Sequence, residues 1–271
     1  MLRILAFLTL FVLSASGQEW SKKCDKENAQ SCAEAAMFYY NLAQNGDQRH
    51  LQRAFEYATK ACEFKSGAGC NILAHFHDNG IATKPNPKKA IKLYDNGCNI
   101  GFAGSCHNLA DIYASGILVK KNYKKAQELY QKACAGGAKE SCRVLGAFFE
   151  EGFFRTSSND AGVVISKIDL QKAREFYQKA CDLSDGVSCN NLAGVLGKLS
   201  QTPDLQVALG LYTKACESSF AVGCFNAGVM FYNAQGTPRD LKKAKEFFTK
   251  ACNGGVSVGC ENVKALEQAG Q

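Results

Sequence analysis

Fourteen cysteines fall into seven pairs, and seven residues separate the two members of every pair. The pairs are Cys24/Cys32, Cys62/Cys70, Cys98/Cys106, Cys134/Cys142, Cys181/Cys189, Cys216/Cys224 and Cys252/Cys260. Their second members follow one another at intervals of 35 to 47 residues, the length range of helix-turn-helix repeats. So regular a spacing indicates a series of stacked repeats, each with a crosslink built in.

The first residues have the pattern of a secretory signal. A cation at Arg3 precedes an apolar run from Ile4 to Leu13, and small residues lead to an expected cleavage site at Gly17. The run is about half as long as a membrane-spanning helix, so we expect no membrane span. We therefore predict a signal peptide over 1–17 and a protein secreted to the periplasm or the medium, where disulfides persist.

The charge of the chain is moderately basic, with a formal net charge of +7. An exported protein of this charge suits acidic wall polymers, anionic lipid or host surfaces as partners, but the charge is equally that of an ordinary helical surface. We do not expect nucleic acid as a partner.

The segments that end at the first cysteine of each pair share two columns. Alanine stands eight residues before the cysteine, and in most segments an aromatic residue stands four before it. The column pairs are Ala54 with Ala58, Ala90 with Tyr94, Ala126 with Tyr130, Ala173 with Tyr177, Ala208 with Tyr212, and Ala244 with Phe248. This spacing forms one apolar stripe on a helix.

A second helix is predicted after the second cysteine of each pair. Small residues four positions after that cysteine would let neighbouring helices approach closely; they are Ala74, Ala110, Gly146, Ala193 and Gly228. Serine often stands just before the cysteine, at Ser31, Ser105, Ser141 and Ser188. Because serine is a preferred N-cap, we expect the helices to begin there.

The cysteine spacing requires a turn between these two helices. On one continuous helix the paired cysteines would lie about 12 Å apart, beyond the limit of about 7 Å for a disulfide. If the chain reverses between them, each pair can bond locally. A closed loop of this length stabilises the fold by roughly 2.5 kcal/mol in the chain-entropy model.

One repeat is longer than the others, with eleven extra residues between Gly152 and Ala173. Such insertions form loops that often carry recognition, although a neutral loop explains it equally well. The segment from Cys260 onwards suits a C-terminal capping helix. We expect one solenoid domain over 18–271 with about six to seven repeats.

The segments "CHNLADIYASG" and "KAQELYQKAC" resemble the Sel1-like repeat, a relative of the tetratricopeptide repeat. The cysteine spacing is similar to that of the Helicobacter cysteine-rich protein family, and the resemblance covers the chain from Cys24 to Cys260. It implies an all-α, right-handed superhelical solenoid with one disulfide per repeat. Members of that family are exported and classed as penicillin-binding proteins or β-lactamases; other Sel1-like proteins are adaptors for protein partners.

The chemistry of β-lactam hydrolysis has no recognisable motif in this sequence. Ser-x-x-Lys, Ser-Asp-Asn and Lys-Thr-Gly do not occur. No two cysteines have the close spacing of a zinc site, and His75 and His77 would not share a helix face. His77 instead suits the position of Tyr113 and Phe149 in neighbouring repeats. We therefore expect no metal and no cofactor, and assign no catalytic residue.

Asparagines two residues after the cysteine form the other polar column: Asn108, Asn191, Asn226 and Asn262. In tetratricopeptide-like superhelices this helix lines the concave side, where asparagines bond an extended peptide. Asn108, Asn191 and Asn226 are therefore the candidate ligand-binding residues. Alternatively, these asparagine side chains accept hydrogen bonds from the backbone N–H groups that have no partner at the helix start.

Two functions follow from these observations. The first is a secreted, monomeric binding protein whose concave groove holds a peptide, a peptidoglycan fragment or a host protein. The alternative is a weak β-lactamase or penicillin-binding hydrolase that acts on β-lactam amides, and this alternative rests on the family resemblance.

Overall fold

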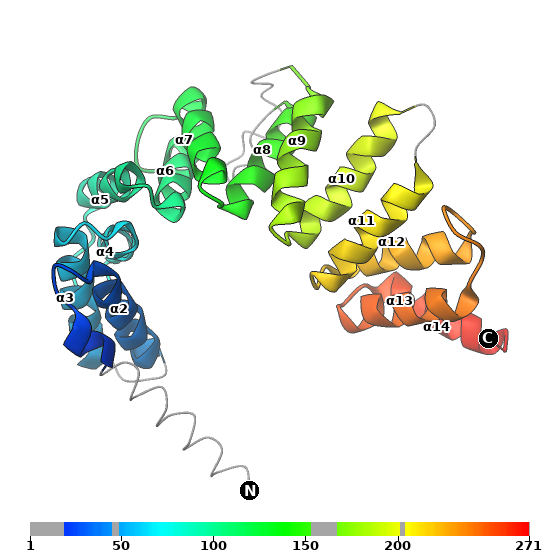
Figure 1. Ribbon diagram of the computed structural model, residues 1–271, viewed down its shortest axis with the longest axis horizontal. Coiled ribbons are helices and arrows are strands. Elements are labelled where there is room, and N and C mark those ends of the chain that lie inside the picture. The colour runs from blue at the N-terminus through cyan, green and yellow to red at the C-terminus, as the bar shows by residue number, and fades with distance from the viewer. Residues whose placement is uncertain (1–18, 45–48, 153–166, 201–203, 271) are drawn as a thin grey trace, which may run out of the picture. The chain divides into compact units, whose positions relative to one another are not determined.

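The computed structural model describes residues 19–44, 49–152, 167–200 and 204–270, and its regular elements are helices (Figure 1). The expected signal peptide and residues 153–166 of the insertion lie outside these ranges. The chain divides into two compact units, Met1–Gly136 and Gly137–Gln271. No helix in the described ranges is long and apolar enough to cross a membrane.

The helices alternate between two roles. Those that begin near a second cysteine are A helices, and those that end near a first cysteine are B helices. The A helices are α2 (Ala29–Gln44), α4 (Gly67–Asn79), α6 (Ala103–Ser115), α8 (Lys139–Glu151), α10 (Gly186–Leu199), α12 (Ala221–Tyr232) and α14 (Ser257–Gln268). The B helices are α3 (Arg49–Glu63), α5 (Pro87–Ile100), α7 (Tyr123–Ala135), α9 (Leu170–Asp182), α11 (Leu205–Glu217) and α13 (Leu241–Asn253).

Within each unit, helices that follow one another in the chain pack together, as do successive A helices such as α4 with α6 and α10 with α12. The alanine column of the B helices is fully buried at Ala54, Ala90, Ala126, Ala173 and Ala244. The expected apolar stripe therefore forms the core, and the all-α repeat fold predicted from the sequence is confirmed.

The predicted helix starts were wrong. Helices α6, α8 and α10 begin two residues before their serine, and Ser105, Ser141 and Ser188 are buried within the first turn. In α10 the cap is Asp185, whose Oδ1 accepts the Ser188 N–H at 2.7 Å. Ser31 likewise lies inside α2.

Gly69 and Gly223 hold the same position as these serines, just before the second cysteine of a pair. The small size of the residues at this position, and not capping, explains why serine or glycine stands there. A Cβ added at Gly69 would lie 2.3 Å from the Cβ of Ala61, and one added at Gly223 would lie 2.5 Å from the Cβ of Ala215. The start of each of these A helices therefore crosses the end of the preceding B helix too closely for a larger side chain.

Six of the seven predicted disulfides form within a unit and are local, as expected. They join Cα atoms 4.4 to 4.7 Å apart and are Cys24–Cys32, Cys62–Cys70, Cys98–Cys106, Cys181–Cys189, Cys216–Cys224 and Cys252–Cys260. Because disulfides persist in oxidising surroundings, this set indicates an extracytoplasmic environment.

Cys134 and Cys142 each form a disulfide, but their pairing with one another stays a prediction. Both cysteines are disulfide-bonded and buried. Cys134 belongs to the first compact unit and Cys142 to the second, because the division falls between Gly136 and Gly137. The bond Cys134–Cys142 therefore stays a prediction from the seven-residue spacing, whereas the other six pairings are observed.

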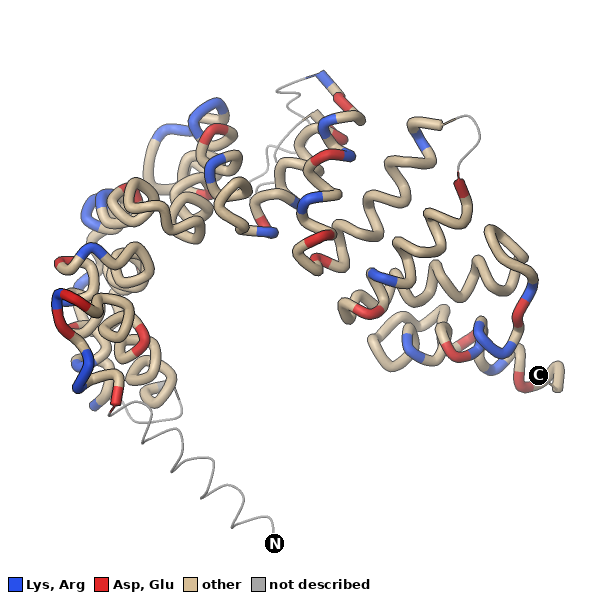
Figure 2. The backbone as a smooth tube through the Cα atoms, in the orientation of Figure 1, with Lys and Arg blue, Asp and Glu red and all other residues tan. Residues whose placement is uncertain are grey.

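Lysines gather where B helices begin. The first three residues of α5 are Pro87, Lys88 and Lys89, and α7 begins with Tyr123, Lys124 and Lys125, so both starts are blue in Figure 2. Neither helix has an acidic residue in its first turn. The lysines therefore lie at the positive ends of the helix dipoles.

Candidate functional site

Buried tyrosines of the B helices bond to carboxylates of the A helices. Tyr177 of α9 donates a hydrogen bond of 2.8 Å to Glu150 Oε2 of α8, and Tyr130 of α7 donates to Asp111 Oδ1 of α6. Burial, helped by the neighbouring carboxylate, raises the pKa of both phenols. Both therefore act as neutral hydrogen-bond donors between their helices.

Two side chains of α10 complete the group around Glu150. Lys198 Nζ lies 2.7 Å from Glu150 Oε1, and the Asn191 side chain hydrogen-bonds to Tyr177. Phenol, carboxylate, ammonium and amide thus satisfy one another across three helices.

The asparagines predicted to contact a ligand also bond to neighbouring residues of the A helices. Asn108 Nδ2 donates to Asn71 Oδ1 at 2.9 Å, and Asn226 Nδ2 donates to Asn190 Oδ1 at 2.8 Å. Asn191 accepts a bond of 3.3 Å from Asn190 Nδ2. The first two bonds link successive A helices, and all five side chains are half-buried.

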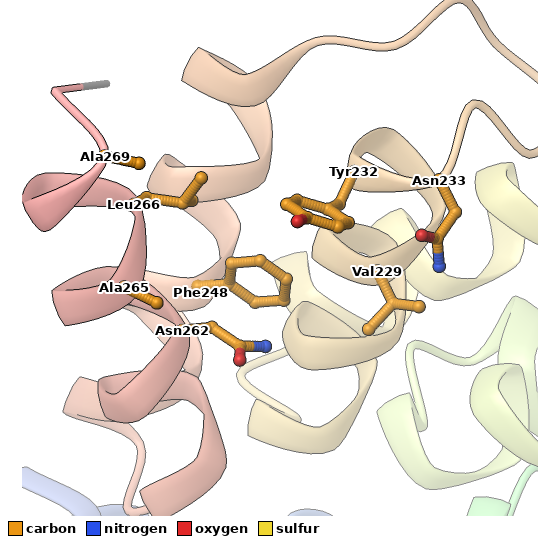
Figure 3. A pocket seen from close by; sticks show the side chains of 8 residues that line it. All are labelled: Val229, Tyr232, Asn233, Phe248, Asn262, Ala265, Leu266 and Ala269. Carbon is orange, nitrogen blue, oxygen red and sulfur yellow. The ribbon is translucent and has the colours of Figure 1, made fainter.

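A cavity of about 340 Å³ opens between α12 and α14, with Phe248 of α13 between their side chains (Figure 3). Its lining residues are Val229, Tyr232, Asn233, Phe248, Asn262, Ala265, Leu266 and Ala269. Asn262, the last asparagine of the column, thus lines a cavity, and this cavity is the candidate site.

The cavity lies where this repeat differs from the fourth repeat in two residues. Relative to the cysteines, Phe248 holds the position of Tyr177, and Tyr232 holds that of Glu150. Phe248 and Tyr232 therefore cannot form the phenol–carboxylate bond that joins Tyr177 to Glu150. Asn262 remains, and its amide lines a largely apolar space.

Gly228 of α12 packs against the ring that lines the cavity. A Cβ added at Gly228 of α12 would lie 2.7 Å from Phe248 Cδ1, just as one at Gly146 would lie 2.5 Å from Tyr177 Cδ1. The phenyl ring therefore lies directly on the glycine of α12, which agrees with the expectation that small residues in this column let neighbouring helices approach closely.

The chemistry of the lining suits an apolar side chain next to a polar backbone. Its side chains are uncharged, and the amides of Asn233 and Asn262 can each donate and accept hydrogen bonds. Tyr232 is 40% exposed, and the Arg239 guanidinium lies 5.1 Å from its ring centre. The cavity can therefore hold an apolar group and bond amides beside it.

Sequence reasoning did not select Tyr232, Asn233 or Phe248 as site residues. One signal was present: among the aromatic residues of its column, Phe248 alone lacks a hydroxyl group. The missing hydroxyl group points to a site only when it is considered together with Tyr232, which belongs to a different helix and a different column.

The two histidines of α4 have different surroundings. His75 is exposed, with Nδ1 3.1 Å from Asn79 Nδ2, whereas His77 is 5% exposed and packs edge-on against Phe55. His77 thus takes the place that Tyr113 and Phe149 hold in other repeats. Among the residues that the structure describes, no three side chains of His, Cys, Asp or Glu are grouped as a metal site.

Six segments of the chain match the family model of the Sel1 repeat, and each contains one A helix and the B helix that follows it. They are residues 29–63, 67–101, 103–137, 140–185, 187–220 and 221–256. The disulfide Cys62–Cys70 therefore joins the end of one repeat to the start of the next. The crosslinks fix successive repeats to one another.

Solved structures of other Sel1 repeat proteins share this fold. A Sel1 repeat protein from Oxalobacter formigenes has a TM-score of 0.65 and 18% identity, over 87% of this chain and 89% of that one. The protective antigen c5321 of uropathogenic Escherichia coli has a TM-score of 0.65 and 17% identity, over 92% of this chain and 58% of that one.

Helicobacter pylori cysteine rich protein B is 31% identical, over 54% of this chain and 98% of that one, with a TM-score of 0.39. A comparison with curated proteins found no match. The six matched segments cover most of the sequence, and on this ground the chain belongs to the Sel1 repeat family.

Proposed function

We propose that this chain is a secreted binding protein that holds an extended segment of a protein partner, with an apolar side chain of that segment in the cavity between α12 and α14. Sel1 repeat proteins mediate protein–protein interactions. The cavity itself, lined by Phe248 and Leu266 with two amides beside them, is the observation that carries the proposal.

The size and lining of the cavity support a side-chain anchor. Ligand pockets typically range from about 300 to 1,000 Å³, and this cavity of about 340 Å³ is at the lower end. Asn233 and Asn262 would bond the peptide groups on either side of the anchored residue, which is how polar groups orient a ligand in an apolar site.

The bound segment would continue along the A helices of the second unit. Asn226 of α12 and Asn191 of α10 come next in the asparagine column, and both are half-buried. Asn108 would contact ligand in the first unit. A peptide or a host protein would supply such a segment, and a peptidoglycan fragment, whose short peptide also carries amide groups, is the other ligand class. Export through a signal peptide over 1–17 is part of the proposal.

A displayed library of random peptides, selected on the purified protein, tests the proposal. The enriched peptides would then be synthesised and titrated by fluorescence anisotropy against the wild type and Ala265→Trp, which fills the cavity. We expect the Kd to rise about tenfold or more, because a buried anchor residue dominates such an interface. Lys264→Trp is the control, since its exposed neighbouring position is outside the lining. Unchanged affinity in Ala265→Trp would refute the site.

Weak β-lactam hydrolysis is the alternative that the family resemblance raised. The cavity lining includes one hydroxyl group, that of Tyr232, and neither a carboxylate nor an imidazole is among its side chains. We therefore expect no turnover of a chromogenic cephalosporin. Turnover that survives repurification and is lost on a single Ser or Glu substitution would favour the hydrolase instead.

A further inference from the structure

Two loops of the first unit carry the same lysine pattern. Residues 80–92 and 116–127 together contain eight lysines and no aspartate or glutamate. The lysines are Lys84, Lys88, Lys89 and Lys92 in one segment, and Lys120, Lys121, Lys124 and Lys125 in the other. Three lysines of the first segment have a counterpart 36 residues later in the second: the pairs are Lys84 with Lys120, Lys88 with Lys124, and Lys89 with Lys125. They therefore occupy equivalent places in two successive repeats.

The two loops also have the same backbone anchors. The Asn86 N–H donates to the His77 carbonyl at 2.6 Å, and the Asn122 N–H donates to the Tyr113 carbonyl at 2.9 Å. Each of these asparagines then caps a B helix, because its Oδ1 accepts a backbone N–H at 3.0 Å. The lysines are therefore presented in the same way in both repeats.

Hydrophobic packing holds the two segments beside each other. Ile91 of α5 belongs to the same cluster as Leu118 and Val119 of the following loop. We call the surface formed by loops 80–86 and 116–122 and the starts of α5 and α7 the lysine edge.

The positive potential of the lysine edge is not offset by its helix caps. Asn86 and Asn122 are neutral, whereas the caps of α9, α11 and α13 in the second unit are aspartates. In α9 the cap Asp169 also pairs with Lys172 at 3.4 Å. Lysines at a helix start are unfavourable for the helix, since the dipole there is already positive. Neutral caps beside lysines leave a surface that attracts anions.

An apolar side chain projects from the same edge. Ile117 is 74% exposed, the highest value for a large hydrophobic residue in the described ranges. It precedes Lys120 by three residues, and Ile81 is its counterpart in the other loop. A soluble polyanion would contact the lysines alone, whereas an apolar side chain can also insert among the headgroups of a bilayer.

We infer that the lysine edge binds the surface of an anionic lipid bilayer, with lysines at the headgroup phosphates and Ile117 inserted between them. The bilayer contact is made by the first unit and does not depend on the cavity of the second.

Cosedimentation of the full-length mature chain with vesicles tests this inference. We expect binding to phosphatidylcholine vesicles that contain phosphatidylglycerol, and loss of binding as salt is raised. Changing four of the exposed lysines, Lys84, Lys88, Lys120 and Lys124, to Gln should weaken partitioning about tenfold or more, because each lysine near an anionic surface contributes to binding. Ile117→Ser should weaken it a few-fold.

A matched control loses the same charge elsewhere on the surface. Lys65, Lys132, Lys242 and Lys264 are also exposed, and their joint change to Gln should leave binding unchanged. Circular dichroism confirms that every variant is folded. Equal binding to vesicles without phosphatidylglycerol, or full binding by the Lys84/Lys88/Lys120/Lys124 variant, would overturn the inference. Heparin binding that needs these lysines, with vesicle binding unaffected by Ile117→Ser, would assign the edge to a soluble polyanion and overturn it too.

Discussion

Lys125 places its ammonium group 4.3 Å from the ring centre of Tyr113 and donates a hydrogen bond of 2.8 Å to the tyrosine hydroxyl. The same pairing recurs in other repeats, always between the start of a B helix and the end of the A helix before it. The recurring pairs are Arg53 with Tyr39 at 5.6 Å, Lys172 with Phe149 at 5.2 Å, and Lys243 with Phe231 at 5.3 Å. A cation and a ring thus connect the two helices of each of these repeats across their loop.

Lys243→Met tests this contact where the ring has no hydroxyl group. The substitution keeps most of the aliphatic chain and removes the cation above Phe231. We expect the free energy of unfolding to fall by about 0.5–1 kcal/mol, the usual size of an exposed cation–π contact. Urea unfolding followed by circular dichroism measures the difference. The adjacent exposed Lys242→Met is the control, and an equal loss there would show that the ring contact contributes nothing.

His77 takes the ring position in the second repeat and introduces pH dependence. Its burial, with the positive charge of Lys89 nearby, lowers the pKa of the imidazole below the ordinary 6.5. The unfolded chain therefore binds a proton that the folded chain resists, so stability falls as the pH drops from 6.5 towards the lower folded-state pKa. We expect His77→Phe to raise the Tm at pH 5 more than at pH 8.

Thermal unfolding between pH 5 and pH 8 provides the measurement, with the exposed His75→Phe as the control. The carboxylates Glu19 and Asp169 have pKa values below their ordinary range, so their own protonation affects stability at lower pH. An identical pH slope in the wild type and His77→Phe would rule out the buried imidazole as its cause.

The disulfides connect repeats, so the stability lost on removing one should depend on its position in the chain. Removing Cys98–Cys106 with two alanines frees the junction between α5 and α6, and we expect a cost of about 2–3 kcal/mol. Removing Cys252–Cys260 frees only α14 and should lower the Tm less. Calorimetry of both variants measures the difference. Equal Tm values for the wild type and the Cys98/Cys106 variant would show that helix packing alone holds the repeats.

The sequence predicted the helices and their crosslinks because both depend on local spacing. Alanine and tyrosine four residues apart define a helix face, and a turn of a few residues brings the paired cysteines together. The helix starts were predicted wrongly because serine suits both an N-cap and a close helix crossing. Ser105 and Gly69 stand in one column, and their common property is small size.

The candidate site could be predicted only in part. Asn262 was visible as a member of a repeated column. The cavity beside it is lined by Phe248, which stands in a column of tyrosines, and by Tyr232, which stands where the fourth repeat has Glu150. These residues lie on helices whose contact is not encoded in local spacing. The hydrogen bond between Asn108 and Asn71 was missed for the same reason. Asn108 stands two residues after its cysteine, whereas Asn71 stands one residue after its own, so the asparagine column does not include Asn71.

Tyr177→Phe recreates in the fourth repeat the substitution that Phe248 represents in the last. It removes the donor to Glu150 and leaves the amide of Asn191 without its phenol partner, while Lys198 still holds the carboxylate. We expect the free energy of unfolding to fall by about 1–2 kcal/mol, since the half-buried carboxylate and the Asn191 amide each lose a hydrogen bond. Urea unfolding measures the loss, and Tyr212→Phe, at the same position of the next repeat and only half-buried, should cost less than half as much. Equal losses in both variants would mean that the bond to Glu150 stabilises the fold no more than an ordinary phenol does.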